Sequence, residues 1–306
     1  MKIQLENVDL QSNSGPNSFA KKLVKHMSAL GCEFKLDKDY DIRLAFIENN
    51  KQDSLNIPMV QRLDGIYFNT DFDYRKQNEN IKKTFLQSDG VIYQTEFNKN
   101  LTQKYFGKHK KSIVIPNGSE IELISQVAPM HEPLLESYKN IWCCASDWRP
   151  HKRLEENIKY FLEHSSENEC LVVAGKTLNF QKNYERVYYT GNLDKLQLIS
   201  LYKASKYFVH LSWLDHCPNV VVDARASGCQ VICSSSGGTK EIAGPNAIVI
   251  QEEEWDFKPT QLYKPPKLDF TKVVKNDYNS VYDMKKVSER YMKYLEEILQ
   301  KHRESK

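Results

Sequence analysis

The stretch that decides the fold is residues 215–244, DHCPNVVVDARASGCQVICSSSGGTKEIAG. A helix is predicted to begin at Pro218 and to end at Gly228, because proline favours the first turn of a helix and glycine the position after its end. The apolar segment Gln230–Cys233 predicts a strand, and the Ser/Gly-rich turn after it opens a second helix. With the strand predicted at 207–211, this stretch forms one βαβα unit with two helix N-termini at one edge of a parallel sheet.

Two aspartates lie beside these predicted helix N-termini. Asp215 precedes the first helix, and Asp223 lies within it. Amide groups and the positive end of a helix dipole bind phosphate, whereas carboxylates accept hydrogen bonds from hydroxyl groups. A phosphate beside a polyol describes a nucleotide sugar, so we expect such a ligand here. The alternative for Asp223 is a helix acid satisfied by nearby amides or by Arg225.

The spacing of these residues resembles that of the retaining GT-B glycosyltransferases of family 4, the glycosyl transferases group 1. That family has two Glu residues separated by seven positions, then Ala-x-x-x-Gly-x-x-Val-Ile, and then Gly-Gly-x-x-Glu. The two acids are Asp here, which shortens the reach of each by one methylene group. The matching residues are Asp215, Pro218–Asn219, Asp223, Gly228, Val231–Ile232, Gly237, Gly238 and Glu241.

The resemblance implies a role for the residues in this stretch. Asp223 would bind the ribose of the donor nucleotide, and Asp215 would lie beside the donor sugar as a catalytic residue. The Gly-Gly turn would offer amides to the phosphate or to the charge that develops on it. The donor-binding residues predicted here are Asp223, Asn219, Gly237, Gly238, Thr239 and Glu241.

A second segment, residues 147–154, matches the family's diphosphate motif in part. The family has Gly-Arg-x-x-Pro-x-Lys-Gly, of which Pro150 and Lys152 are present, whereas Asp147 fills the position of the arginine. The resemblance implies that Lys152 is a catalytic residue, which binds the diphosphate and neutralises charge on the departing nucleotide. The task of the missing arginine falls to Arg149, which we count as donor-binding, or to Arg153, or is lost.

The N-terminal half offers two further candidate positions. Gly15 precedes a predicted helix, as in the family's glycine loop for the donor phosphates, but Pro16 follows it instead of a second glycine. Residues 61–65 follow a predicted strand at a point where relatives often have a His near the reacting sugar. Arg62 and Asp64 are candidates to replace that His, with Asp64 as the catalytic group. A structural turn is the alternative.

The order of predicted elements indicates an α/β protein with two domains. A chain of 306 residues exceeds the usual size of one domain. Strands and helices alternate in the second half, which is typical of a parallel sheet with helices on both faces. We therefore expect the GT-B fold, two Rossmann-like domains facing a cleft. They cover 1–120 on the acceptor side and 121–280 on the donor side, with a helix at about 281–302 packing back on the first.

Two details of this plan rest on composition. The segment 121–137 is polar and irregular, so it is predicted to be the interdomain linker after the family-like signature Ile115-Pro116-Asn117-Gly118. The N-terminal half has few predicted strands and helices, so the first domain is expected to be small for this fold.

Charge and cysteine usage limit the classes of partner. The 43 Lys and Arg residues against 40 Asp and Glu give a net charge of +3 without a long basic block, so nucleic-acid binding is not expected. Basic clusters at Lys108–Lys111 and Lys285–Lys286 are predicted to be solvated surface, with an anionic lipid or glycan acceptor as the alternative. The seven Cys fit buried free thiols in a reducing compartment, without zinc-site spacing. We expect a cytoplasmic protein, with peripheral membrane contact left open.

These observations favour a metal-independent, retaining, hexosyltransferase-like enzyme that uses a nucleoside-diphosphate sugar. Its acceptor would be a hydroxyl of a glycan or lipid-linked glycan, and neither a cofactor nor a metal is expected. The Asp-x-Asp sequence considered as a metal site, Asp71 to Asp73, lies in a polar loop. The main alternative is a GT-B pseudoenzyme that binds a nucleotide, glycan or partner protein, as the missing arginine and the two Asp residues allow. A sugar-nucleotide epimerase is disfavoured, because no matching acid and His set is present.

Overall fold

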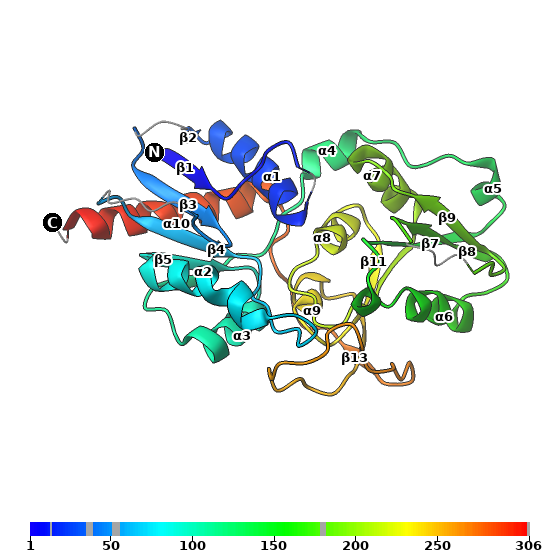
Figure 1. Cartoon of the computed structure of the whole chain (residues 1–306). Helices are drawn as coiled ribbons and strands as arrows, with labels where there is room; N and C mark the ends of the chain where they lie inside the picture. Colours follow the sequence, from blue (N-terminus) through cyan, green and yellow to red (C-terminus); the bar gives the residue numbers. More distant parts are fainter. Residues whose placement is uncertain (13, 35–38, 51–55, 178–181, 305–306) are drawn as a thin grey trace. The chain divides into compact units, whose positions relative to one another are not determined.

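A computed structural model describes the chain except residues 13, 35–38, 51–55, 178–181 and 305–306 (Figure 1). The chain divides into two compact units. Unit 1 comprises Met1–Gly118, Phe257–Thr260 and Val281–Lys306, and unit 2 comprises Ser119–Asp256 and Gln261–Ser280.

The short segment Phe257–Thr260 was predicted in the second domain and lies instead in unit 1. The Thr260 N–H donates to the carbonyl of Phe68 at 3.1 Å, and the Thr260 carbonyl accepts from the N–H of Thr70 at 3.0 Å. These backbone bonds connect two segments almost 200 positions apart in the chain, a pairing that local composition does not reveal.

Unit 1 is built on a six-stranded, wholly parallel sheet with strand order β2-β1-β3-β4-β5-β6. Its strands are β1 (Lys2–Glu6), β2 (Glu33–Phe34), β3 (Ile42–Phe46), β4 (Met59–Leu63), β5 (Gly90–Tyr93) and β6 (Ser112–Val114). Its helices are α1 (Gly15–Ala29), α2 (Tyr74–Gln87), α3 (Glu96–Phe106) and α10 (Met284–Glu304). The first domain therefore has more secondary structure than predicted, because α2 and β2 were missed.

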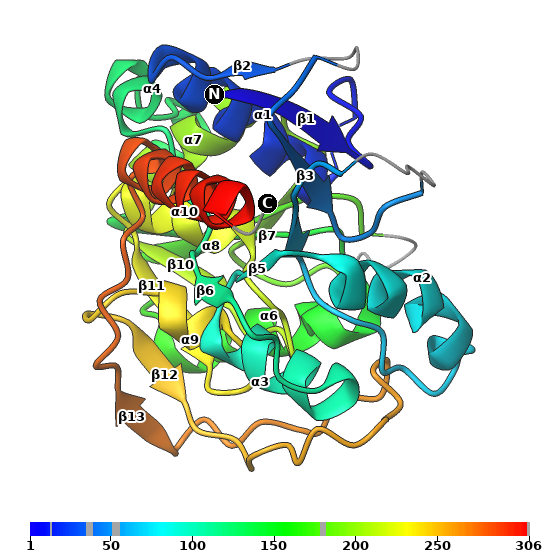
Figure 2. The same ribbon diagram turned by 90° about the vertical axis from the view of Figure 1, so that its left-hand side faces the viewer.

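The helices of unit 1 cover both faces of its sheet (Figures 1 and 2). Helices α1 and α10 lie together on one face, where Phe19, Leu23, Tyr291 and Leu295 join one core cluster with the central strands. Helices α2 and α3 lie on the other face. The sequence explains the first pair, because apolar residues recur every three or four positions along α1 and α10.

Close packing at the start of α10 requires a glycine in the segment that leaves unit 1. A Cβ atom on Gly118 would lie 2.8 Å from the Cα of Met284. The Gly118 carbonyl also accepts a hydrogen bond from the buried Lys22 ammonium at 3.2 Å. The Pro-Asn-Gly turn thus lies directly against the first residue of the C-terminal helix.

A fully buried arginine connects β4 to α1, to α10 and to the turn after β6 within unit 1. Arg62, on β4, is 0% exposed and forms an ion pair with Asp64. Its guanidinium donates to the Tyr291 hydroxyl at 3.0 Å and to the Asn117 side-chain oxygen at 2.7 Å, and it lies 4.1 Å from the ring centroid of Phe19. A buried charge is tolerated only when it is paired and hydrogen-bonded in this way.

Unit 2 is built on a seven-stranded sheet with strand order β13-β12-β11-β10-β7-β8-β9, parallel except for β13. Its strands are β7 (Asn140–Ala145), β8 (Glu169–Ala174), β9 (Val187–Gly191), β10 (Tyr207–His210), β11 (Gln230–Ser234), β12 (Ile248–Ile250) and β13 (Val273–Lys275). Its helices are α4 (Ile121–Gln126), α5 (Pro133–Glu136), the 3₁₀ turn η1 (Pro150–Lys152), α6 (Leu154–His164), α7 (Lys195–Ala204), α8 (Asn219–Ala226) and α9 (Thr239–Ile242).

Two core clusters fill the two faces of this sheet. Helix α6 packs on one face through Ile158 and Phe161, and α7 and α8 pack on the other through Leu201 and Val221. Successive strand residues point to opposite faces, so neighbours such as Cys143 and Cys144 belong to different clusters. All seven cysteines are buried and free, as the sequence predicts.

The prediction that 121–137 is an irregular linker is wrong. The segment holds α4 and α5 and belongs to unit 2. The Lys203 ammonium, from α7, donates to the carbonyls of Ile124 at 3.0 Å and of Val127 at 2.5 Å, and Leu135 is buried in the core. A few tertiary contacts thus fix a segment whose own sequence is mostly polar.

In the described part of the chain, no helix combines the length and the apolar character needed to cross a lipid bilayer.

The Arg62 cluster generates a stability prediction. Arg62→Met should destabilise unit 1 by about 3–5 kcal/mol, because it removes several partners at once and leaves the Asp64 carboxylate without its cation. Hydrogen exchange at the β3 and β4 amides measures this free energy locally. Arg75→Met, at an exposed position on α2, is the matched control and should change it by less than about 0.5 kcal/mol. Equal exchange in the two variants would contradict a structural role for Arg62.

Candidate active site

Three neighbouring strands of unit 2 end at the edge that carries the candidate residues. Strands β7, β10 and β11 are adjacent and parallel, so the segments after them leave the same edge of the sheet. Lys152 follows β7 in the turn η1, Asp215 follows β10, and Gly237 follows β11. From the sequence spacing alone, only Asp215 and Gly237 could be predicted to lie close together.

The centre of this edge is a cluster of three polar side chains. The Lys152 ammonium lies 2.5 Å from Oδ2 of Asp215, and Nε2 of His210 lies 3.0 Å from the same oxygen. The side chains of Lys152 and Asp215 are 17% and 13% exposed, so the ion pair is partly desolvated but can be reached by a ligand. His210, the last residue of β10, is 1% exposed.

Electrostatics keep the Asp215 carboxylate ionised. Burial by itself would raise its pKa, but the Lys152 ammonium and the hydrogen bond from His210 hold the pKa well below its usual value. Burial lowers the pKa of His210, and the neighbouring Asp215 offsets this effect only in part. At neutral pH the cluster therefore holds one cation, one anion and a neutral imidazole.

The Gly-Gly turn packs directly against the backbone of Asp215. Gly237 has φ = +76°, and a Cβ atom there would lie 2.5 Å from the Asp215 carbonyl oxygen. The N–H of Gly238 donates to that same carbonyl at 2.7 Å. One of the amides predicted to bind phosphate therefore fixes the Asp215 loop instead. The first role of these glycines is to let two loops approach each other closely.

Thr239 and Glu241 lie in the short helix α9 and are both buried. The Thr239 hydroxyl is buried without a hydrogen-bond partner in the part of the chain that the structure describes. A buried polar atom of this kind costs free energy until a partner satisfies it. Thr239 is therefore a candidate to accept or donate a hydrogen bond when a ligand or water is present.

Asp223 lies in the middle of α8, and the Ser119 hydroxyl donates to its Oδ1. Ser119 is fully buried and is the first residue of unit 2. Arg225, the sequence-based alternative partner, donates to the carbonyls of Ile242 at 3.1 Å and Ser280 at 3.2 Å. Asn219, also predicted to bind the donor, is the first residue of α8 and half-buried.

The arginines considered for the missing family position differ sharply in environment. Arg153 is buried and binds both oxygens of Glu252, at 2.9 and 2.7 Å, and adopts φ = +53°. It is a structural residue, which excludes it as the substitute. Arg149 is exposed and pairs with Asp147 at 3.0 Å. Arg149 is the one of the two that a ligand can reach.

The candidates from the N-terminal half lie in unit 1. Asp64 pairs with the buried Arg62 and accepts a hydrogen bond from the Gln94 amide at 2.9 Å. These partners favour the structural turn over a catalytic role for Asp64. Gly15 is the first residue of α1.

The Asp-x-Asp sequence has a local structural function. The Asp73 carboxylate accepts from the N–H of Lys76 at 3.1 Å and caps α2. Within the described residues, no group of three or more His, Cys, Asp or Glu is placed to hold a metal ion.

Sequence reasoning missed two of the residues that contact the candidate acids. His210 interrupts the apolar strand 207–211 five residues before Asp215, a signal that was available. Ser119 is more than 100 residues from Asp223 and has no comparable signal. His151 was also missed; it is buried beside Lys152, and its ring stacks on Tyr263 at 5.6 Å between centroids.

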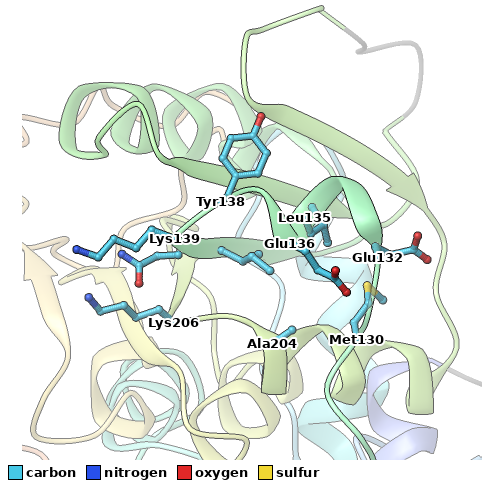
Figure 3. A pocket seen from close by; sticks show the side chains of 10 residues that line it. Met130, Glu132, Leu135, Glu136, Tyr138, Lys139, Ala204 and Lys206 are labelled. Carbon is cyan, nitrogen blue, oxygen red and sulfur yellow. The ribbon is translucent and has the colours of Figure 1, made fainter.

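A separate cavity of about 240 Å³ lies at the opposite edge of the unit 2 sheet, where β7 begins and where Lys206 precedes β10 (Figure 3). Lys139 and Lys206 lie on one side of it, and Glu132 and Glu136 lie on the other. None of the predicted site residues lines this cavity. The chemistry therefore does not coincide with the cavity, and we place the candidate site at the Asp215 edge.

Comparison with a protein family decides the class of this unit. Residues 130–257 match the model of the family described as glycosyl transferases group 1. Residues 130–257 form a glycosyl transferases group 1 domain. This segment contains Lys152, Asp215, Asp223 and the Gly-Gly turn, and the match confirms the predicted resemblance to glycosyl transferases group 1 and the predicted class of enzyme, a glycosyltransferase. Among curated proteins, no sequence matches the chain.

Solved structures show the same fold over nearly the whole chain. Sucrose-phosphate synthase from Thermosynechococcus elongatus is 13% identical with a TM-score of 0.64, covering 99% of this chain and 93% of its own. HepE from Anabaena, in complex with UDP and glucose, is 15% identical with a TM-score of 0.65, covering 97% and 100%. WaaG, a glycosyltransferase involved in lipopolysaccharide biosynthesis, is 12% identical with a TM-score of 0.60, covering 99% and 94%. The predicted GT-B fold class is confirmed.

The buried imidazole next to Lys152 generates a pH prediction. Burial lowers the pKa of His151 to about 3, whereas an unfolded chain has a His pKa of about 6.5. Below pH 6.5 the unfolded state takes up this proton and the folded state does not, so stability present above that pH is lost as the pH falls. His151→Phe should flatten the acid limb by about 1.4 kcal/mol per pH unit between pH 6 and 4.

Urea unfolding at a series of pH values measures this slope. His131→Phe is the matched control, because the His131 side chain is 79% exposed. If both variants keep the wild-type slope, the buried His151 does not contribute to the loss of stability at acid pH.

Proposed function

We propose that this protein is a retaining glycosyltransferase that moves a sugar from a nucleoside-diphosphate sugar to a hydroxyl group of a glycan or lipid-linked glycan. The observation that carries the proposal is the Lys152–Asp215 ion pair, 2.5 Å long, at the carboxyl ends of β7 and β10 within the glycosyltransferase domain. It joins a phosphate-binding cation to a hydroxyl-binding carboxylate at one point.

Each member of the pair has a distinct task in this proposal. The Lys152 ammonium exchanges the Asp215 carboxylate for the diphosphate of the donor and neutralises charge as the nucleotide departs. Asp215, ionised and thus an acceptor only, takes hydrogen bonds from hydroxyls of the donor sugar. Lys152 makes one charge-assisted hydrogen bond before the exchange and one after it. Its ammonium is therefore paired both without and with the donor.

The nucleoside is assigned to Asp223, on the helix α8 that follows the Asp215 loop. Asp223 is proposed to accept from the ribose hydroxyls, with the Ser119 hydroxyl orienting its carboxylate. Arg149 and the buried Thr239 hydroxyl are proposed further contacts of the diphosphate. The complex of the fold neighbour HepE with UDP and glucose supports a nucleotide sugar as the ligand class.

Retention and metal independence are the finer parts of the proposal. The bond between the anomeric carbon and the diphosphate breaks with its electron pair going to the diphosphate. The acceptor oxygen bonds to the same face of that carbon, and its proton passes to the departing phosphate. Lys152 and helix amides supply the positive charge that a metal would otherwise provide.

A binding protein without transfer activity is the second candidate. It is favoured by the replacement of the family arginine by Asp147, whose carboxylate pairs with Arg149 at 3.0 Å. That pair places a negative charge where the family has a positive one. A panel of UDP, GDP, ADP and their sugars, tested for binding and for sugar release, separates the two candidates.

The first prediction concerns the diphosphate. Lys152→Met should weaken nucleoside-diphosphate binding by about ten- to hundredfold, the worth of one charge-assisted hydrogen bond. The uncovered Asp215 carboxylate would add repulsion in the same direction. Binding of the nucleoside without phosphates should be unchanged. Titration calorimetry measures both ligands, and Lys159→Met, at an exposed position on α6, is the matched control.

Transfer by the wild-type protein is then assayed in saturating chelator. Activity should persist, because no step of the proposal uses a metal. A loss that added magnesium or manganese restores would overturn the metal-independent mechanism. Equal diphosphate affinity in Lys152→Met and wild type would remove Lys152 from the site.

A further prediction tests the contact between Asp223 and the ribose. Asp223→Asn and the 2′-deoxy nucleotide should each weaken binding, and the two changes should be non-additive, because each removes part of one interaction. A double-mutant cycle by calorimetry gives the coupling energy. Additive penalties would show that Asp223 does not touch the ribose.

A further inference from the structure

His210 is a buried polar group of the site to which the proposed function gives no task. It closes β10, its side chain is 1% exposed, and its Nε2 lies 3.0 Å from Oδ2 of Asp215. We propose that His210 is a positioning residue that aims the Asp215 carboxylate at the donor sugar. This inference rests on the proposed function, because it assigns Asp215 to sugar hydroxyls.

The geometry divides the two carboxylate oxygens of Asp215. Both Lys152 and His210 contact Oδ2. The described residues contribute no side-chain hydrogen bond to Oδ1, and the carboxylate side chain remains 13% exposed. The protein therefore fixes one oxygen and leaves the other for an external donor. A sugar hydroxyl is such a donor, and Oδ1 is an acceptor of defined direction.

The ring of His210 must carry its hydrogen on Nε2. The Asp215 carboxylate is ionised and can only accept, so the imidazole donates. The charged or titratable groups around His210 are Asp215, Lys152 and His151. Because Nε2 is occupied and the ring is buried, His210 is placed to orient the acid rather than to exchange protons with substrate.

His210 also keeps the Asp215 carboxylate in place when a donor binds. Lys152 would leave Asp215 for the diphosphate, and a carboxylate held by Lys152 alone would then be free to rotate. The His210 bond remains, and the Asp215 carbonyl is separately tied to the N–H of Gly238 at 2.7 Å. The backbone and one carboxylate oxygen thus stay in place during the exchange.

The test compares His210→Gln with His210→Asn. The Gln amide nitrogen reaches about as far as Nε2 and can keep the bond, whereas the Asn amide is one atom shorter and loses it. Carbon-13 NMR of the Asp215 carboxyl measures its pKa in both variants and in wild type, without any donor. We expect the pKa to rise in His210→Asn and to stay near the wild-type value in His210→Gln.

The second arm measures binding of UDP and of UDP-glucose to the same three proteins, with GDP, ADP and their glucose conjugates in parallel. His210→Asn should lose about ten- to hundredfold in affinity or in kcat/KM for the sugar nucleotide, and less than about threefold for the nucleoside diphosphate. The acid limb of its kcat/KM profile should move to higher pH. His210→Gln should restore most of both.

The two arms keep the inference and the proposed function separate. An Asp215 pKa that is the same in all three proteins overturns the positioning role, whether or not sugar is transferred. So does an equal loss of affinity for sugar nucleotide and for nucleoside diphosphate. If wild type binds none of these nucleotides, the proposed function fails and the sugar-directed role of His210 fails with it. The NMR arm would still report whether His210 and Asp215 are coupled.

Discussion

The parallel pairing of β7, β10 and β11 is the constraint on which the candidate site depends. Adjacent parallel strands end at one edge, so three loops within a stretch of more than 80 residues bring Lys152, Asp215 and Gly237 to one place. The 2.5 Å contact between Lys152 and Asp215 follows from this pairing. An antiparallel neighbour would have placed one of the two at the opposite edge.

Each unit also contains an arginine that is almost completely buried. Arg62 is fully buried in unit 1 with Asp64 and Tyr291, and Arg153 is buried in unit 2 with Glu252. Both form ion pairs and hydrogen bonds with loop residues or with residues far away in the sequence, so they stabilise particular loop conformations. Arg62 and Arg153 were both candidates for the site, and their burial shows that both are structural residues instead.

The acids of the site differ in how they are held. Asp215 is ionised by a cation and a neutral imidazole, whereas Asp223 accepts from the hydroxyl of Ser119 at the point where the chain enters unit 2. A carboxylate that already has an ordered partner loses less conformational entropy when a ligand arrives. Both acids are Asp rather than Glu, and shorter side chains have fewer rotamers to order.

The sequence by itself determined the βαβα unit, its helix and strand order, the fold class and the family of residues 130–257. These follow from local signals, namely Pro218 and Gly228 at the helix ends, apolar periodicity, and the spacing of Asp215, Asp223 and Gly237. Helix α2 was missed because half of its buried positions are polar, with Asn78 and Thr84 beside Ile81 and Phe85. The helices within 121–137 were missed because they are short and tertiary contacts hold them.

Only the tertiary structure decided which charges are available to a ligand. Asp215 contacts both Lys152 and His210. Arg153 is buried in an ion pair with Glu252, and Asp64 forms an ion pair with Arg62. The sequence could place each charged residue on a loop or strand end, but it could not specify its partner. Ion pairs and hydrogen bonds form within about 3–4 Å in space, a distance that sheet topology and packing set between residues far apart in the chain.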